Sequence, residues 1–278
     1  MFAAVFRRFS LLALASLTLT GWAAVHAADL APTEQLLPPN VLVYFSVPSC
    51  TDFQERFADT NFGRMVNDAA MADVRAEVMK KFEEASQDAE DEIGMPLSDL
   101  MAIPTGEAAF AVVQPPGEKL GLIVFLDVGD HEDLLDKLLD KAEQGIEEKG
   151  QLTRSTDEFE GTEITVYTDE NAGPNDPVKG FSFFVKDGMF VLGTTVDLLE
   201  AALVRWDGQH DRTFAGDATF GYILERCDLP GDDEPVMTWF FNPLGLFKAG
   251  MAAAGPEVGM QGAMVMGFLP VLGLDRVK

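Results

Sequence analysis

The sequence has few basic residues, few histidines and few cysteines for its length. Among 278 residues there are 20 Lys and Arg against 46 Asp and Glu, which gives a formal net charge of −26. This balance argues against a nucleic-acid partner and against docking on an anionic lipid surface, because both need basic surface. It is compatible with high solubility, divalent cations or a basic partner, and it does not decide among them.

Motifs of the common catalytic classes are also missing. The chain has no G-x-S-x-G, no H-E-x-x-H, no G-x-x-x-x-G-K-[ST] and no G-x-G-x-x-G behind a strand. Paired carboxylates of glycosidase type have no fixed spacing in a sequence, so a hydrolase that uses Asp and Glu stays an alternative. We expect a non-catalytic protein without a cofactor.

Residues 1–27 have the pattern of an export signal. Arg7 and Arg8 precede an apolar run from Leu11 to Val25, and Val25-His26-Ala27 supplies a small-x-Ala cleavage site. The rival interpretation is a retained anchor, but this run is short for a bilayer core of about 30 Å. We therefore expect a cleaved signal peptide, a periplasmic or extracellular location, and no transmembrane span after cleavage.

Periodicity divides the rest of the chain into three parts. Residues 28–40 form a polar lead-in, residues 41–248 an α+β domain, and residues 249–278 a Gly/Ala/Met-rich segment that resembles the truncated start of a further unit. Alternating or β-branched apolar residues predict strands at Val41–Val47, Ala108–Val113, Leu120–Val128, Glu163–Tyr167, Phe181–Lys186, Met189–Thr194 and Val236–Phe241.

Apolar residues at helical spacing predict the helices. Candidates are Cys50–Thr60, Phe62–Ile93, Asp130–Lys149, a segment after Thr194, and Phe220–Cys227. The candidate helix Phe62–Ile93 has an apolar stripe that comprises Met65, Val66, Ala69, Ala72, Ala76, Met79 and Phe82. In the third, Asp130 is the expected N-cap and Gly150 follows the last turn.

The order of these elements predicts the fold class. Hairpins alternate with single helices, and Asp187-Gly188 is a typical two-residue hairpin turn. We expect an α+β fold in which helices pack on one face of a mainly antiparallel sheet. Two strand pairs are each followed by a Leu-rich helix, which is compatible with a duplicated unit or with an ordinary α+β sequence.

Cys50 and Cys227 are the only cysteines in the sequence. In an exported protein they are candidates for a disulfide, with two buried thiols as the alternative, because spacing alone does not establish their proximity.

Four hard oxygen ligands make the loop TDENAGPNDP a weak calcium candidate: Asp169, Asn171, Asn175 and Asp176. Turn-forming Asx, Gly and Pro explain the same composition, and the spacing does not match an EF-hand loop.

Histidines and one tryptophan are the remaining candidates for a site. His131 lies between Asp130 and acidic residues, where a solvated helix start is favoured over a metal pair. His210 occupies a polar loop. Trp206, nearby, is expected to be a core or hinge aromatic and not a stacking platform.

Three stretches, LLPPNVLVYFSV, LGLIVFLDVGD and FVKDGMFVLGTTVDLLEAALVRWDG, resemble a family of exported bacterial proteins of unassigned function, a domain of unknown function. The shared features are an opening L-P-x-x strand, a strand ending in D-V-x-D before a Leu-rich helix, and a K-D-G hairpin. The resemblance covers roughly Leu36 to Lys248 and implies a location in the cell envelope. It carries no catalytic residues.

The sequence thus favours an exported, non-catalytic protein that binds or scaffolds an envelope protein. A carrier of an apolar or lipid-like ligand is the first alternative, because 21 Phe and 12 Met could line a cavity, although most such residues form ordinary core. The Asp/Glu-dependent hydrolase is the second.

Overall fold

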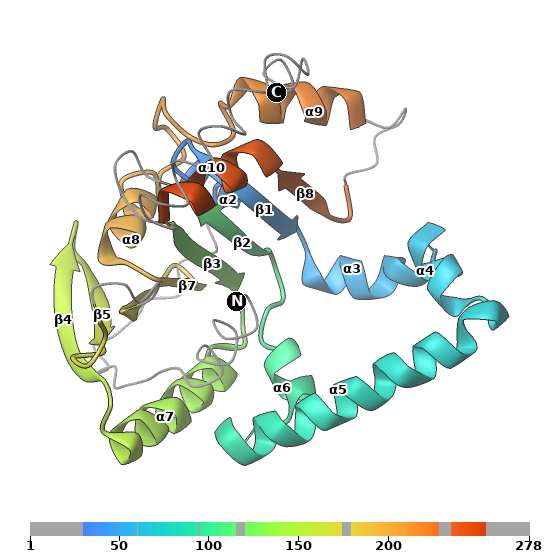
Figure 1. The fold of residues 1–278 in the computed structure, drawn as a ribbon, viewed down its shortest axis with the longest axis horizontal. Helices are drawn as coiled ribbons and strands as arrows, with labels where there is room; N and C mark the ends of the chain where they lie inside the picture. The colour runs from blue at the N-terminus through green and yellow to red at the C-terminus, as the bar shows by residue number, and fades with distance from the viewer. Residues whose placement is uncertain are drawn as a thin grey trace.

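The structure is a computed structural model that describes residues 30–59, 61–93, 95–114, 120–173, 179–227 and 235–253. Groups of helices and groups of strands follow one another along these segments (Figure 1). In chain order the elements are α2 (Thr33–Leu36), β1 (Val41–Val47), α3 (Cys50–Arg56), η1 (Phe57–Asp59), α4 (Asn61–Asn67), η2 (Ala69–Met71), α5 (Ala72–Ile93), α6 (Leu97–Met101), β2 (Ala108–Val113), β3 (Gly121–Asp127), α7 (Glu132–Lys149), β4 (Thr153–Phe159), β5 (Thr162–Thr168), β6 (Gly180–Lys186), β7 (Met189–Gly193), α8 (Val196–Leu203), α9 (Ala218–Cys227), β8 (Thr238–Phe241) and α10 (Pro243–Ala253).

The eight strands form one antiparallel sheet in the order β4-β5-β6-β7-β3-β2-β1-β8. The expected α+β class with an antiparallel sheet is confirmed. The β6–β7 turn has positive φ at both Asp187 (51°) and Gly188 (78°), as the predicted two-residue hairpin requires.

One face of the sheet, which we call the first face, carries the larger core. Tyr44, Phe125 and Phe240 point to it and are buried against residues from α2, α8 and α9. Leu36 and Leu37, at the end of α2, are almost fully buried in this core. Leu30 and Ala31, which precede α2, also pack against this core, so part of the predicted lead-in belongs to the domain.

The opposite, second face carries a smaller core under α7. The helix places Leu135, Leu139, Ala142 and Ile146 against aromatic residues of β5, β6 and β7. Helices therefore cover both faces of the sheet, where the sequence predicted one face. This division follows from strands that are apolar on both sides, because each apolar face needs its own cover.

α7 begins at Glu132, so its N-cap is His131 and not the predicted Asp130. The His131 side chain does not cap the helix. Its Nδ1 lies 2.7 Å from the Ala102 carbonyl oxygen, which ties the helix start to the end of α6. At the other end Gly150 takes the left-handed conformation and donates its N–H to Ile146, as predicted.

Between β1 and β2 the chain leaves the sheet and forms an arm, residues 50–93, which contains α3 to α5 (Figure 1). The predicted helix over Phe62–Ile93 is interrupted after Asn67, where Asp68 caps a short 3-10 turn through a bond from the Ala70 N–H. In the part of the chain that is described, no helix combines the length and apolarity needed to cross a membrane.

Candidate functional site

A single cross-strand row of side chains on the second face runs through all eight strands. Its members, in spatial order from β4 to β8, are Thr156, Thr165, Phe183, Leu192, Val124, Phe110, Phe45 and Trp239. Directly paired residues share a face, so these side chains form one continuous surface. α7 covers the middle of the row, where Phe183 is buried.

Toward β8 the same row becomes exposed. Phe110 is 38% exposed and Trp239 is 76% exposed, while Phe45 between them is half-buried and stacks on Phe110 with ring centroids 5.7 Å apart. A neighbouring row repeats the pattern with Val112, Val43 and Phe241, the last 56% exposed. We call these six side chains of β2, β1 and β8 the open face.

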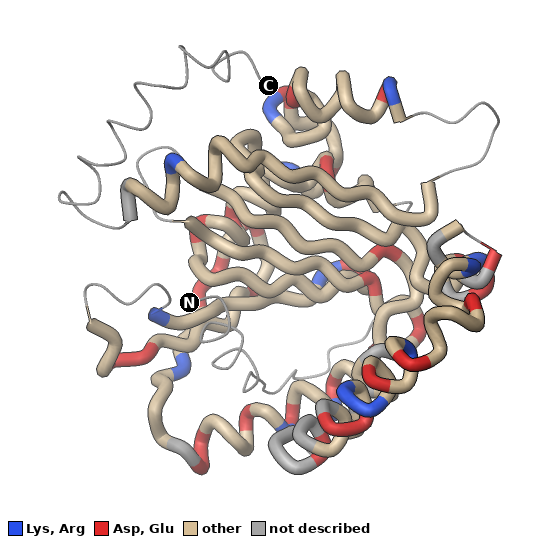
Figure 2. Tube along the Cα trace, turned by 45° about the vertical axis from the view of Figure 1, so that its right-hand side comes forward, with Lys and Arg blue, Asp and Glu red and all other residues tan. Residues whose placement is uncertain are grey.

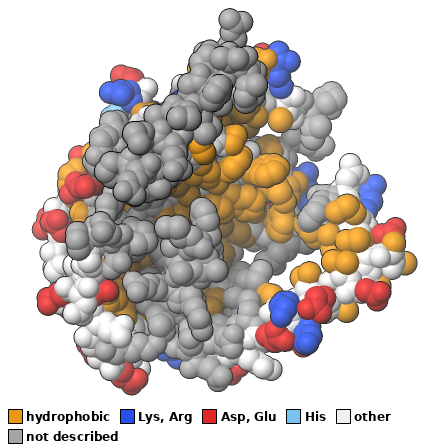
Figure 3. Space-filling model, in the orientation of Figure 1, with side chains coloured by type: hydrophobic (Ala, Val, Ile, Leu, Met, Phe, Trp, Pro, Cys, Tyr) orange, Lys and Arg blue, Asp and Glu red, His pale blue; other side chains and the backbone are white. Residues whose placement is uncertain are grey.

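The open face contains no charged side chain, although the chain as a whole is strongly acidic. Figure 2 shows the central strands free of charge and the acidic residues spread along the helices and connections. Figure 3 shows hydrophobic side chains gathered over β8 and β1, and again over the arm. Exposed apolar surface of this extent on a sheet typically marks a contact surface.

The arm exposes a second apolar surface. Val74 and Val78 of α5 are 52% and 60% exposed, and Met79 and Met65 are exposed to a similar degree. The stripe predicted from the sequence includes Met65 and Met79 but neither valine, and at these two methionines it is exposed and does not face the core. The most extensive contacts of α5 with other helices of the domain are those with α6 and α7.

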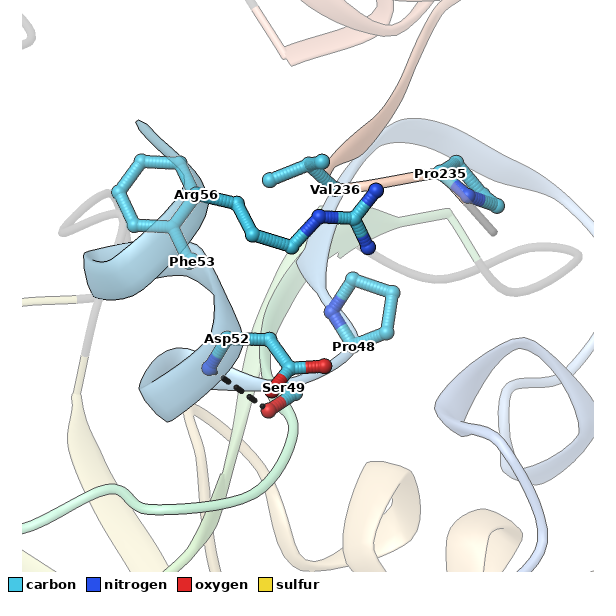
Figure 4. A pocket seen from close by; sticks show the side chains of 7 residues that line it. All are labelled: Pro48, Ser49, Asp52, Phe53, Arg56, Pro235 and Val236. Carbon is cyan, nitrogen blue, oxygen red and sulfur yellow. Dashed lines mark hydrogen bonds between the residues drawn. The ribbon is translucent and has the colours of Figure 1, made fainter. Parts of the chain in front are cut away.

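A shallow hollow lies between the start of α3 and the residues before β8 (Figure 4). Its walls are Pro48, Ser49, Asp52, Phe53, Arg56, Pro235 and Val236. Ser49 caps α3 there by accepting the Asp52 N–H at 3.1 Å. The hollow is open to solvent and has a charged wall, so it does not resemble an enclosed apolar ligand site.

Two carboxylates, those of Glu34 and Glu107, lie close together beside the first face. A hydrolase that uses Asp and Glu would need such a pair. Glu107 accepts bonds from the hydroxyls of Thr33 and Ser46, each at 2.6 Å, and Glu34 accepts the Tyr44 hydroxyl at 3.0 Å. Burial, and then the Glu107 charge, raise the pKa of Glu34. Thr33, Tyr44 and Ser46 are buried, so the cluster joins α2 to the sheet and presents no open space for a substrate.

The structure leaves both thiols free and does not form the candidate disulfide. Cys50 starts α3, Cys227 ends α9, and Figures 1 and 2 place these helices in different parts of the molecule. Burial, and then the charges of Asp127 and Glu107, raise the pKa of the Cys50 thiol. This thiol is therefore a poor nucleophile at neutral pH.

The calcium candidates are only partly within the described residues, because Asn175 and Asp176 lie outside them. Asp169 accepts the Asn171 backbone N–H at 2.9 Å, which is an Asx turn. Among the residues that are described, no group of three or more His, Cys, Asp or Glu could hold a metal ion. What is seen of the loop fits the turn interpretation.

The other single residues are engaged in local structure. His210 Nδ1 accepts the Arg212 N–H at 3.0 Å within its loop. Trp206 packs against the first core, with Phe184 edge-on at 5.4 Å, and its indole N–H donates to Asp187 at 2.8 Å. Trp206 therefore fastens the end of α8 to the β6–β7 hairpin, in line with the predicted core or hinge role.

Sequence reasoning did not find the open face. The available signal was that VLVYFSV, AAFAVV and TWFF are apolar at successive positions, which predicts cover on both sides of these strands. That signal does not say which element supplies the cover.

Comparison with known proteins adds no relative, because no family model, curated protein or solved structure matches this chain. The resemblance to exported bacterial proteins therefore stays a prediction.

Proposed function

We propose that this chain is an exported, non-catalytic protein that binds or scaffolds a partner protein in the cell envelope through its open face. The observation that carries the proposal is the cross-strand row, which is apolar from Phe183 to Trp239, buried under α7 at Phe183 and exposed at Phe110 and Trp239. Removal of apolar surface from water is the dominant favourable term in most protein–protein association, so an uncovered aromatic surface is suited to association.

The shape of the surface favours a protein over a small molecule. Carriers enclose their ligands in a concave site, whereas the open face is a pleated surface three strands wide. The open hollow at the start of α3 does not supply such an enclosure. The internal bonding of Glu34, Glu107 and Tyr44 likewise weighs against the hydrolase alternative.

The test is co-purification of the tagged full-length chain from the cell envelope after mild cross-linking, with mass spectrometry of the products. We expect a stoichiometric protein partner that is lost when Trp239→Asp places a charge in the open face. Tyr222→Asp is the matched control, because Tyr222 of α9 is also an exposed aromatic, at 55%, and lies outside the open face.

Equal recovery of the partner with both variants would contradict the proposal. So would turnover of a glycoside or ester substrate by the purified chain, since the protein would then be an enzyme.

A further inference from the structure

Residues 30–37, which contain α2, pack on the first face of the sheet, and we call them the clasp. Leu36 and Leu37 of the clasp are buried in the first core. Phe214 and Ala215 donate their backbone N–H groups to carbonyl oxygens of the clasp. Opening the clasp would break these bonds and expose apolar core to water, so the contacts that hold the clasp closed decide whether it opens separately from the sheet.

Two carboxylates meet at one hydroxyl where the clasp joins the sheet. Tyr44 of β1 donates its hydroxyl to Glu34 of the clasp at 3.0 Å, and a Glu107 oxygen lies 3.5 Å from the same hydroxyl. Glu107, the residue before β2, also accepts the Thr33 backbone N–H at 3.0 Å and the hydroxyls of Thr33 and Ser46. One carboxylate therefore belongs to the clasp and the other to the edge of a strand, and both are fixed in place.

α8 and the loop after it also pack against the clasp, with Gly208 beside Ala31 and Gln35. Their charged groups are engaged elsewhere. The charges that act on Glu200 of α8 are those of Asp197 and Asp157. In the loop, Arg205 donates to nearby carbonyl oxygens, and Asp217 accepts the N–H groups at the start of α9. The ionisable groups that act on Glu34 are Glu107 and Tyr44.

The closed clasp favours the protonated form of Glu34. Two carboxylate anions at one hydroxyl repel each other, and burial adds a cost for the charge. Burial, and then the Glu107 charge, raise the pKa of Glu34, although the bond from Tyr44 lowers it. Burial, and then the two carboxylates, raise the pKa of Tyr44, so the hydroxyl keeps its proton and stays a donor. Opening the clasp would return Glu34 to water and separate it from Glu107.

We propose that the clasp is a pH-sensitive device: binding of a proton by the two carboxylates at the Tyr44 hydroxyl tightens it, and loss of that proton lets residues 30–37 open while the sheet stays folded. The stabilisation of the closed clasp is fully present below the ordinary pKa of a glutamate, 4.5, and is lost as the pH rises through the higher pKa of Glu34 in the closed clasp. This contact lies on the first face, so the inference does not depend on the function proposed for the open face.

The test is amide hydrogen exchange of the mature full chain at several pH values between about 4 and 8, with each rate divided by the intrinsic exchange rate at that pH. The reporters are the N–H groups of Thr33, Leu37, Phe214 and Ala215, which all bond across or within the clasp. We expect their protection to fall as the pH rises. The N–H of Gly150, at the end of α7, is the internal control and should show no such fall.

Glu34→Gln supplies the second measurement. A neutral amide oxygen still accepts the Tyr44 bond, so we expect the clasp amides of this variant to lose their pH dependence and to stay protected at high pH. Asp211→Asn is the matched control, because it removes the same formal charge from an exposed residue of the neighbouring loop and should keep the wild-type pH dependence. Circular dichroism checks that both variants are folded.

Two results overturn the inference. If the protection of the clasp amides and of Gly150 changes alike with pH, the clasp opens only when the whole domain unfolds. If Glu34→Gln and Asp211→Asn alter the pH dependence of the clasp amides equally, the net charge of the chain controls the opening and the carboxylates at Tyr44 do not.

Discussion

At the scale of single residues, buried polar groups hold the start of the domain to the sheet. Thr33 donates its hydroxyl to Glu107, and its hydroxyl oxygen lies 2.8 Å from the Tyr44 hydroxyl oxygen. Glu34 joins this network with a carboxylate that is largely removed from water. A carboxylate with a raised pKa is less stable, as an anion, in the folded chain than in the unfolded one.

The direction of the Glu34 shift sets a pH dependence of stability. The pKa of Glu34 in the folded chain lies above the ordinary value of 4.5. The contribution of Glu34 to the free energy of unfolding is therefore fully present below pH 4.5 and is lost as the pH rises through the folded pKa. We expect Glu34→Gln, which stays neutral and still accepts the Tyr44 bond, to be more stable than the wild type at pH 7. Below about pH 4 the difference should disappear.

Denaturant melts at several pH values measure this effect. Asp211→Asn is the control, because it removes the same formal charge from an exposed loop residue. If Glu34→Gln raises the free energy of unfolding at pH 7 no more than Asp211→Asn does, then only the change in net charge matters.

At the scale of elements, the sequence predicted the buried strands and missed the exposed one. β1, β2, β3, β5, β6 and β7 fall where apolar or β-branched residues recur. β4 reads TRSTDEF, and its first six residues are exposed, so no apolar pattern marks it. Its pairing with β5 places it at the edge of the sheet. α2 was missed for another reason, because a four-residue helix has no periodicity to detect.

β5 and β6 approach each other closely at Gly180, and this leaves no room for a larger side chain. A Cβ on Gly180, at the start of β6, would lie 2.0 Å from the Tyr167 carbonyl oxygen of β5, and backbone cannot move aside as a flexible side chain does. We expect Gly180→Ala to lower the free energy of unfolding by about 1–3 kcal/mol.

Gly145→Ala is the opposite case. Gly145 lies within α7 with nothing near its Cβ position, so alanine should stabilise the helix by roughly 0.5–1 kcal/mol. Thermal unfolding of both variants checks the pair. Equal stability of Gly180→Ala and the wild type would show that the β5–β6 pair tolerates a wider spacing.

At the scale of the whole molecule, the acidic excess shapes stability more than any single ion pair. The few ion pairs among the described residues are exposed or long, such as Lys80–Glu84 at 3.8 Å, and pairs of this kind contribute about 0–1 kcal/mol. A net charge of −26 makes the compact chain repel itself, and dissolved salt screens that repulsion.

We therefore expect added salt to raise the melting temperature. Raising NaCl from about 10 to 150 mM shortens the Debye length from roughly 30 to 8 Å. A gain of about 1 kcal/mol in the free energy of unfolding corresponds to a rise of about 2–4 °C in the melting temperature. CaCl₂ at the same ionic strength should raise the melting temperature no further than NaCl does. The reason is that the Asp169 carboxylate already accepts the Asn171 N–H in an Asx turn. An extra rise that Asp169→Asn abolishes would establish the calcium site instead.

The contact surfaces belong to this scale as well, and they explain why sequence reasoning stopped short of a site. That α5 exposes apolar residues on one side can be read from Val74 and Val78, and that β1 is apolar on both sides can be read from Tyr44 and Phe45. Whether α5 covers the open face depends on where α4 and α6 hold the ends of α5. No local sequence pattern predicts those contacts.

The arm also sets the order in which the sheet can assemble. Val47 of β1 pairs with Ala108 of β2, yet the whole arm and α6 lie between them in the chain, whereas Lys186 and Met189 close a hairpin across two residues. The entropy lost on closing a loop grows with its length, so local hairpins form early and β1 must wait for a distant strand. β8 pairs with β1 at the edge of the sheet, so we expect the edge that carries Trp239 to form late.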